Sequence, residues 1–231
     1  MYNFKNKKGV ILGSTGLLGS RLAKKLSELG ADLILHGKSK ESLKELDNNI
    51  KKLGKRSSLV EADLTDINFY SNLQNIILSR FKSVDFLINS VGKFNGLYPS
   101  THLTHKMWND LIELNLNSYW RSLKELEPLL KKSENPRVIF FSNDEISNGL
   151  AYYNVFSICK AAIKAFCRTY QDENKRLKIC LNLVEIKNLN SGMSSNILQR
   201  RKISDKSLNL IVDQIINKCF FEDNENILIN I

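Results

Sequence analysis

Three glycines near the start of the chain have the spacing of a phosphate-binding turn. The apolar run Gly9–Leu12 predicts a buried β-strand, and leucines from Leu18 to Leu29 recur at helical spacing. The turn between them consists of Gly13, Ser14, Thr15, Gly16, Leu17, Leu18 and Gly19. Glycine lets the backbone come close to a pyrophosphate, and the helix that follows presents N–H groups and a positive dipole to that anion. Glycines that serve only packing are the alternative, but the position after a buried strand favours a dinucleotide site.

The end of the next apolar run bears on which dinucleotide would bind. Residues Asp32–His36 predict a second strand, and Gly37, Lys38 and Ser39 follow it. A site that prefers NAD(H) has Asp or Glu here, to accept hydrogen bonds from the ribose 2′-hydroxyl. No acid is present in this segment, and Lys38 can pair with a 2′-phosphate. The segment therefore favours NADP(H) over NAD(H); a solvated surface lysine is the alternative for Lys38.

Short apolar runs alternate with longer amphipathic stretches along all 231 residues. The expected strands are 9–12, 32–36, 59–61, 84–89, 137–142, 178–185 and 226–229. The expected helices are 17–29, 40–53, 69–81, 106–131 (with an irregularity near Pro128), 151–171 and 207–220. Strands that alternate with helices of this length imply βαβ crossovers. The pattern, without repeat or linker, predicts a single Rossmann-type α/β domain over 1–231, with a doubly wound parallel sheet of about seven strands and helices on both faces.

Charge and the first residues narrow the possible partners. The formal net charge is +10, but the lysines are scattered along the chain, so nucleic acid is not expected as a partner. Only four apolar residues precede Gly13 after the basic start, too few for a signal-peptide core or a membrane span. We expect a cytoplasmic protein that does not bind membranes.

Cysteine and histidine do not have the spacing of a metal site. The four cysteines form no C-x-x-C pair, and His102 and His105 have no further ligand nearby in the sequence. We expect reduced thiols and no bound metal. The cysteines are Cys159, Cys167, Cys180 and Cys219.

Further short segments follow the predicted elements in order. Asp63 and Leu64 come after the third strand, and Asn89, Ser90, Val91 and Gly92 after the fourth. Asn115 lies within the long predicted helix, and Lys160-Ala161-Ala162 within the next. Together these segments resemble the short-chain dehydrogenases/reductases, and within them the compact bacterial members. In that family the Asp lies against the adenine, an Asn-Asn-Ala-Gly segment ends the fourth strand, and an Asn and a Lys belong to the catalytic tetrad.

The resemblance implies an oxidoreductase that acts on a carbonyl or alcohol with NAD(P)(H), but two members of the tetrad differ. The family's Tyr stands four residues before the Lys, where this chain has Phe156. The family's Ser falls at Asn143, beside Ser142. After the sixth strand the chain has Ile186-Lys187 in place of Pro-Gly, and Ser191 falls where a Thr would bond the carboxamide. The glycine spacing is that of extended rather than classical members.

These departures affect the proton, since the tyrosine donates it during carbonyl reduction. Phe156 has none to give, and Asn143 can polarise a carbonyl oxygen without protonating it. Tyr153 shares a helical face with Lys160 but stands about 10 Å along the axis, so its substitution as the acid would need an irregular helix start. Three hypotheses follow: an oxidoreductase with an altered site; a non-catalytic relative that binds the dinucleotide as a sensor or partner subunit; or an anion-binding or nucleic-acid-binding module that has lost the cofactor.

Assembly is also implied by the resemblance. The two long helices, 106–131 and 151–171, are those that form the family's four-helix contact between subunits. The second carries Ala162, Ala165, Phe166 and Tyr170, enough apolar surface to face both a sheet and a partner. We therefore expect a homodimer or homotetramer. The substrate is not predicted by any residue pattern.

Overall fold

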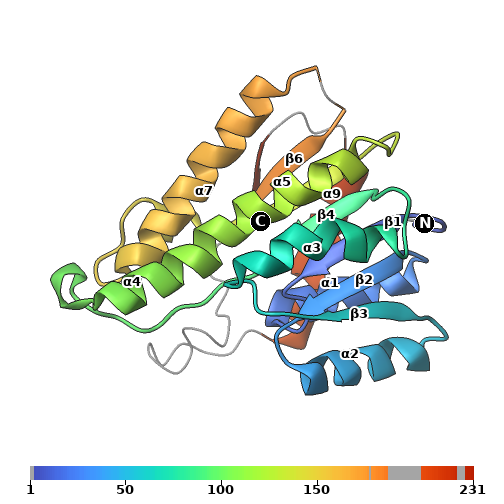
Figure 1. Ribbon diagram of the computed structural model, residues 1–231, viewed down its shortest axis with the longest axis horizontal. Coiled ribbons are helices and arrows are strands. Elements are labelled where there is room, and N and C mark those ends of the chain that lie inside the picture. Colours follow the sequence, from blue (N-terminus) through green and yellow to red (C-terminus); the bar gives the residue numbers. More distant parts are fainter. Residues whose placement is uncertain (1–2, 177, 187–203, 223–226) are drawn as a thin grey trace.

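Seven parallel strands form one sheet at the centre of the computed structural model, which describes residues 3–176, 178–186, 204–222 and 227–231 (Figure 1). The strands are β1 (Lys8–Leu12), β2 (Asp32–Gly37), β3 (Ser57–Glu61), β4 (Phe86–Asn89), β5 (Arg137–Ser142), β6 (Cys180–Glu185) and β7 (Leu228–Asn230). Their order in the sheet is β3-β2-β1-β4-β5-β6-β7, and neighbouring strands run parallel. The predicted doubly wound parallel sheet is confirmed.

Helices cover both faces of this sheet. One face carries α1 (Leu17–Glu28), α2 (Lys40–Lys52) and α9 (Asp205–Phe220). The other carries α3 (Ile67–Leu78), α5 (Ser118–Leu130) and α7 (Asn154–Glu173). Shorter elements are the 3₁₀ turn Ser100–His102, α4 (His105–Ile112) and α6 (Asp144–Ser147). The chain therefore winds to one face on leaving β1 and to the other on leaving β4.

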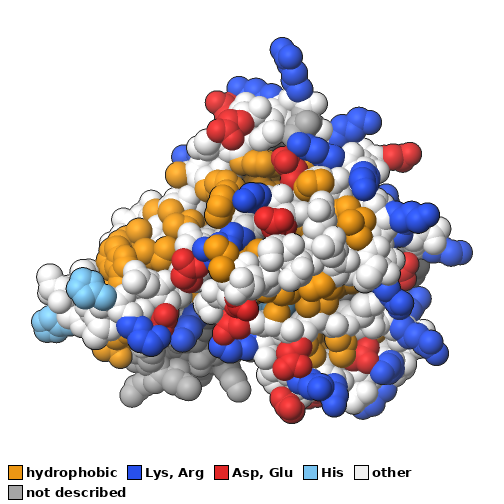
Figure 2. All heavy atoms as spheres, viewed as in Figure 1, with side chains coloured by type: hydrophobic (Ala, Val, Ile, Leu, Met, Phe, Trp, Pro, Cys, Tyr) orange, Lys and Arg blue, Asp and Glu red, His pale blue; other side chains and the backbone are white. Residues whose placement is uncertain are grey.

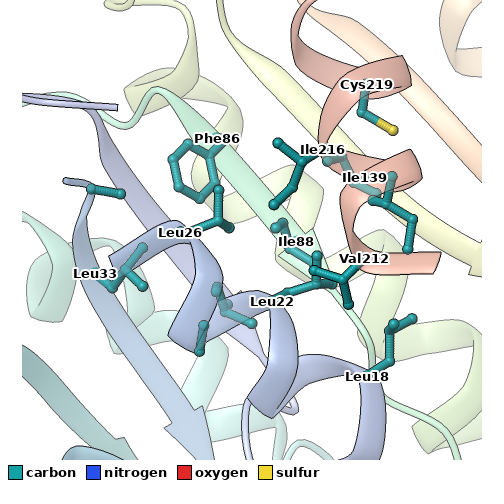
Figure 3. Close-up of a cluster of buried hydrophobic side chains, with 14 of the residues drawn as sticks. Leu18, Leu22, Leu26, Leu33, Phe86, Ile88, Ile139, Val212, Ile216 and Cys219 are labelled. Carbon is teal, nitrogen blue, oxygen red and sulfur yellow. The ribbon is translucent and has the colours of Figure 1, made fainter. Parts of the chain in front are cut away.

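Alternation along the strands produces two hydrophobic cores. Ile11 faces the core beneath α1 and α9, whereas its neighbours Val10 and Leu12 face the core beneath α3, α5 and α7. Figure 3 shows the first core, where leucines of α1 lie near Val212 and Ile216 of α9 on the same face of the sheet. Because strands buried on both faces must be apolar throughout, the continuous apolar runs of the sequence were the correct signal for this sheet.

The long helix expected over 106–131 is interrupted, but not near Pro128. The interruption is a π-helical turn at Glu113–Asn117 between α4 and α5. There the side-chain amide of Asn115 donates to the carbonyl oxygen of Leu111 at 2.9 Å, an oxygen that a regular helix gives to a backbone N–H. Pro128 lies in the last turn of α5 and does not end the helix.

The helix expected from residue 151 begins three residues later, at Asn154. Tyr152 and Asn154 both have positive φ, at 67° and 39°, so the backbone turns sharply here. The side-chain nitrogen of Asn154 donates to the carbonyl oxygens of Tyr98 (3.2 Å) and Tyr152 (3.0 Å) and holds this turn. Within the described ranges, no helix is both long enough and apolar enough to cross a membrane.

Candidate functional site

The carboxyl ends of β1 and β4 lie side by side where the winding of the sheet reverses. Leu12 of β1 is in register with Asn89 of β4, so the glycine turn and the segment that begins at Ser90 leave the sheet together. Open α/β sheets bind ligands at such a point, in the crevice outside the strand ends. The Oγ of Ser90 joins the two segments by donating to the carbonyl oxygens of Leu12 (2.9 Å) and Gly13 (3.2 Å).

Two positions of the turn admit only glycine. Gly13 has φ +73°, and a Cβ there would lie 3.1 Å from the backbone nitrogen of Val91. At Gly19 a Cβ would overlap the carbonyl oxygen of Gly13 and lie 2.7 Å from the Oγ of Ser90. The glycines therefore bring α1, β1 and the segment after β4 into direct backbone contact. Gly16 is different, because a Cβ there would meet only the oxygen of Gly13, at 3.3 Å.

The amino end of α1 has no side-chain cap and no acid in its first turn. Among the described helices, α5 and α7 also begin without a side-chain cap, but neither follows a glycine turn, and at the start of five others a side-chain oxygen accepts a backbone N–H. Those capping residues are Ser39 (α2), Asp66 (α3), Thr104 (α4), Asn143 (α6) and Ser204 (α9). A bare helix end beside a glycine turn leaves N–H groups and positive dipole for an anionic ligand. This cradle fits the diphosphate of a dinucleotide.

The turn residues predicted for the cofactor offer mainly backbone. The Ser14 side chain is fully buried and donates to the carbonyl oxygen of His36 at 2.9 Å, and Leu18 packs into the core beneath α1. Gly16 and Leu17 are exposed, and Thr15 is half-buried. The part of the turn that is open to a ligand is therefore residues 15–17, where the backbone is not buried.

Lys38 and Asp63, predicted separately, form an ion pair. The Nζ of Lys38 lies 2.5 Å from the Oδ2 of Asp63, and their side chains are 78% and 36% exposed. Partial burial raises the pKa of Asp63, but hydrogen bonds from Lys38 and Thr65 outweigh it and hold the pKa at about 2. Leu64 is buried beside α3. The pair lies beyond the ends of β2 and β3, on the side of the glycine turn where an adenosine ribose would lie.

The segment after β4 is held from the α5 side. The amide of Asn89 donates to the Oγ of Ser122 (3.3 Å), and its oxygen accepts the N–H of Val91 (3.1 Å). The hydroxyl of Tyr119 donates to the carbonyl oxygen of Val91 at 2.6 Å. Asn115 holds Lys93, two residues further on, because its side chain both accepts from and donates to the backbone of Lys93. Asn89 and Tyr119 thus hold Val91, the π-helical turn holds Lys93, and Gly92 lies between them.

Lys160 is buried among aromatic rings near the ends of β4 and β5. Its Nζ donates to the carbonyl oxygen of Phe141 at 3.0 Å and lies 5.3 Å from the ring centre of Phe156 and 5.6 Å from that of Tyr119. Burial lowers the pKa of Lys160 to about 8. A lysine has three N–H donors, so two remain for a ligand.

Asn143, at the position of the family's serine, supports the backbone. Its oxygen accepts the N–H of Ile146 at 3.0 Å, and its nitrogen donates to the carbonyl oxygen of Ile186 at 2.9 Å. Only one N–H of this amide is left for a substrate. Ser142 beside it is buried, and its Oγ donates to the carbonyl oxygen of Lys160.

Sequence reasoning missed the role of Phe94, which lies between the strand ends and α7. Its ring stacks on that of Tyr153 at 5.0 Å between centroids and contacts Phe156 at 5.5 Å. The only available signal was an aromatic residue soon after Gly92. Ser191 lies outside the described residues, as does residue 187. Within the described ranges, no group of three or more His, Cys, Asp or Glu side chains could hold a metal ion.

Comparison with known proteins gives consistent matches. A family described as short chain dehydrogenase matches residues 7–202. Fatty acyl-CoA reductase of Acinetobacter baylyi is 28% identical over 185 residues, covering 79% of this chain but only 62% of that protein. The solved Escherichia coli oxidoreductase yciK has a TM-score of 0.87 at 18% identity, covering 98% of this chain and 95% of that one. A Shigella flexneri 2a protein described as a short chain dehydrogenase and complexed with NADP has a TM-score of 0.83 at 19% identity, covering 92% and 89%.

Proposed function

This chain belongs to the short-chain dehydrogenase family, and on that premise we propose that it is an oxidoreductase that prefers NADP(H) and acts on a carbonyl or alcohol, with an active site that lacks the family's tyrosine. The observation that carries the proposal is the uncapped amino end of α1, set against the glycine turn beside β4. Of the helices with a described first turn, this one alone combines a bare end with a glycine turn.

Backbone and side-chain groups around the turn would each bind a different part of the cofactor. Backbone N–H groups at the start of α1 bind the diphosphate, Asp63 and Leu64 flank the adenosine, and the free N–H groups of Lys160 bind the nicotinamide ribose. The cofactor, when bound, supplies or accepts the hydride. Phe156 has no proton to exchange, and the one free N–H of Asn143 can polarise a carbonyl oxygen without protonating it. We infer slow reduction by the wild-type chain.

Substrate chemistry is proposed only as a class. A relative that covers most of this chain carries the name of a fatty acyl-CoA reductase, and Phe94, Tyr153 and Phe156 form an aromatic cluster beside Lys160. Aldehydes and acyl thioesters with apolar chains are therefore the first compounds for a substrate panel, together with sugars and cyclic ketones as contrasts.

The test of the function is calorimetric titration with NADPH and NADH. Trp108 and Trp120 are 38% and 46% exposed on α4 and α5, so tryptophan fluorescence is a poor reporter of the glycine turn. We expect NADPH to bind with a micromolar Kd and more tightly than NADH. Absence of binding by either dinucleotide would overturn the proposal. Tight binding without turnover across the panel would instead indicate a sensor or partner subunit.

Lys38→Glu is expected to reverse the cofactor preference. Lys38 is the cation at the end of β2, and Glu in its place would repel a 2′-phosphate and accept hydrogen bonds from a 2′-hydroxyl. The Kd of NADPH should rise about 10–100-fold, the value of one charge-assisted hydrogen bond, while that of NADH stays level or falls. Lys44→Glu, an exposed change of equal charge on α2, is the control. Equal effects of the two changes on both dinucleotides would count against a role for Lys38.

We also propose a homodimer or homotetramer built through α5 and α7. Figure 2 shows hydrophobic side chains gathered over the lower part of α7, at the left of the view. Ile158 of α7 is 49% exposed and Trp120 of α5 is 46% exposed. Ile158→Glu should give a monomer in light scattering at micromolar concentration, because a charge would be buried in the contact. Ile67→Glu, at an equally apolar and 62% exposed site on α3, should leave the assembly intact. A monomeric wild type would refute the proposed assembly.

The proposed compartment is the cytosol. Cys159, Cys167 and Cys219 are thiols buried in the structure, with no disulfide bond. A reducing compartment would keep these thiols in that form.

A further inference from the structure

His36 occupies an unusual place for an imidazole, at the buried end of β2 behind the glycine turn. Only 3% of its surface is exposed. Its Nδ1 lies 3.3 Å from the backbone nitrogen of Gly13, and its Nε2 lies 3.1 Å from the carbonyl oxygen of Ala62. The ring of Phe69 covers it at 5.7 Å between centroids. The ring therefore bridges the turn after β1 and the segment after β3.

The two partners determine which nitrogen carries the proton. A backbone N–H can only donate, so Nδ1 must be the unprotonated acceptor for Gly13. A carbonyl oxygen can only accept, so Nε2 must carry the hydrogen that bonds Ala62. Only the neutral Nε2–H tautomer makes both bonds. A proton on Nδ1 would face the N–H of Gly13 donor to donor.

The backbone of His36 also binds the glycine turn, in addition to the bond that its ring accepts from Gly13. The carbonyl oxygen of His36 accepts both the N–H and the hydroxyl of Ser14, each at 2.9 Å. Gly13, between the ring and Ser14, has φ +73°, a conformation that needs support from its surroundings. On the other side, Ala62 directly precedes Asp63, which is paired with Lys38. One residue thus fixes both segments that would contact the adenosine and the diphosphate.

We propose that His36 is a positioning residue for the dinucleotide: as a neutral Nε2–H imidazole it holds the glycine turn and the Ala62–Asp63 segment in register, and protonation releases the turn. This proposal rests on the proposed cofactor binding. His36 does not itself need to touch the ligand. Its effect on affinity passes through Gly13 and the start of α1.

Burial and the neighbouring polar groups shift the pKa of His36 in opposite directions, and burial has the larger effect. Burial lowers the pKa of His36 from 6.5 to about 4, against smaller raising effects from the Ala62 hydrogen bond and from Asp63. Asp63 is the acid that faces the ring, and Lys38 on the β2 side is paired with it. Since the folded pKa lies below the unfolded one, the stabilisation is complete above pH 6.5 and is lost as the pH falls towards 4.

The first experiment is nitrogen NMR of the free protein with labelled histidine. We expect His36 to show a pyridine-type Nδ1 and a pyrrole-type Nε2 at pH 7, and to keep this pattern at about pH 5.5, where an ordinary imidazole is mostly protonated. The exposed His102 and His105 provide the comparison in the same spectrum. A reversed tautomer, or protonation of His36 above pH 6, would overturn the proposal. This measurement needs no cofactor, so it remains decisive if the proposed function fails.

Three variants then separate the two bonds at pH 7. His36→Phe keeps the ring volume and loses both bonds; the Oδ1 of His36→Asn can replace Nδ1 toward Gly13, and the Nε2 of His36→Gln can replace the donor to Ala62. We expect the Kd of NADP⁺ to rise about tenfold or more in His36→Phe, with Asn restoring more affinity than Gln. Faster exchange of the Gly13 amide hydrogen should accompany the loss.

His102 provides the matched control for His36. His102→Phe alters an exposed histidine by the same substitution and should leave affinity and exchange unchanged. If His36→Phe lowers Tm but leaves both the Kd of NADP⁺ and the exchange of Gly13 unaltered, His36 serves only packing and the proposal is wrong. If wild type binds no NADP⁺ while the NMR and exchange results are as expected, His36 does hold the glycine turn and the Ala62–Asp63 segment together, and the proposed function is wrong.

Discussion

Phe156→Tyr is expected to raise kcat/KM for carbonyl reduction by about 10²–10⁴-fold, the usual contribution of a general acid. Phe156 is 6% exposed, and its ring already lies 5.3 Å from the Nζ of Lys160. A phenol there would acquire a cationic neighbour, which favours tyrosinate and so lowers the phenol's pKa. The measurement is NADPH oxidation across the substrate panel, wild type against variant at equal protein concentration.

Two control variants test whether the gain depends on the new hydroxyl and on Lys160. Phe156→Leu adds no hydroxyl and should bring no increase, while Phe156→Tyr combined with Lys160→Met should lose most of the gain. If the wild type turns over and Phe156→Tyr leaves its rate unchanged, the chain already has another acid. Tyr153, stacked on Phe94 three residues earlier, would then be the candidate, and Tyr153→Phe would abolish the wild-type rate.

Gly19→Ala should nearly abolish dinucleotide binding and also lower stability. A methyl group at residue 19 would collide with the backbone oxygen of Gly13 and with Ser90, so α1 must move away from the turn. Overpacking of this kind costs about 1–3 kcal/mol of the free energy of unfolding. Displacement of the helix end from a diphosphate should weaken binding about 100-fold, as expected for one or two charge-assisted hydrogen bonds.

Thermal unfolding with and without NADPH checks both parts. Gly16→Ala, whose methyl group meets only one atom at 3.3 Å, is the matched control and should keep nearly the wild-type Tm without ligand. If NADPH stabilises the Gly19→Ala protein as much as it stabilises wild type, Gly19 is not required for binding.

The sequence predicted the fold well because its signals are local. Strands buried on both faces need continuous apolar residues, and residues 137–142 were predicted with their observed bounds. The glycine turn was also predictable, because Gly13, Gly16 and Gly19 directly follow a buried strand in the sequence. The helix interruption was misplaced because proline is a stronger local signal than Asn115, whose effect depends on a bond to Lys93 in another segment.

The site was less predictable because its partners are distant in sequence. Lys38 and Asp63 were each assigned to the cofactor, but their ion pair depends on β2 and β3 being neighbours. Asn143 was assigned to substrate, yet most of its amide supports Ile146 and Ile186. His36 gave no signal beyond an imidazole ending an apolar strand; its role needs both Gly13 and Ala62 in place.

The register of β1 with β4 has a consequence for unfolding. The glycine turn belongs to the half of the sheet that ends at β3, whereas Ser90 and Lys160 belong to the half that begins at β4. A dinucleotide held by both halves would resist any opening that separates β1 from β4. Partial opening of the sheet along this line would expose apolar strand surface to proteases, and bound cofactor would suppress it by mass action. Protection from proteolysis should therefore grow with cofactor concentration. The cleavages that the cofactor suppresses should lie on both sides of the boundary between β1 and β4.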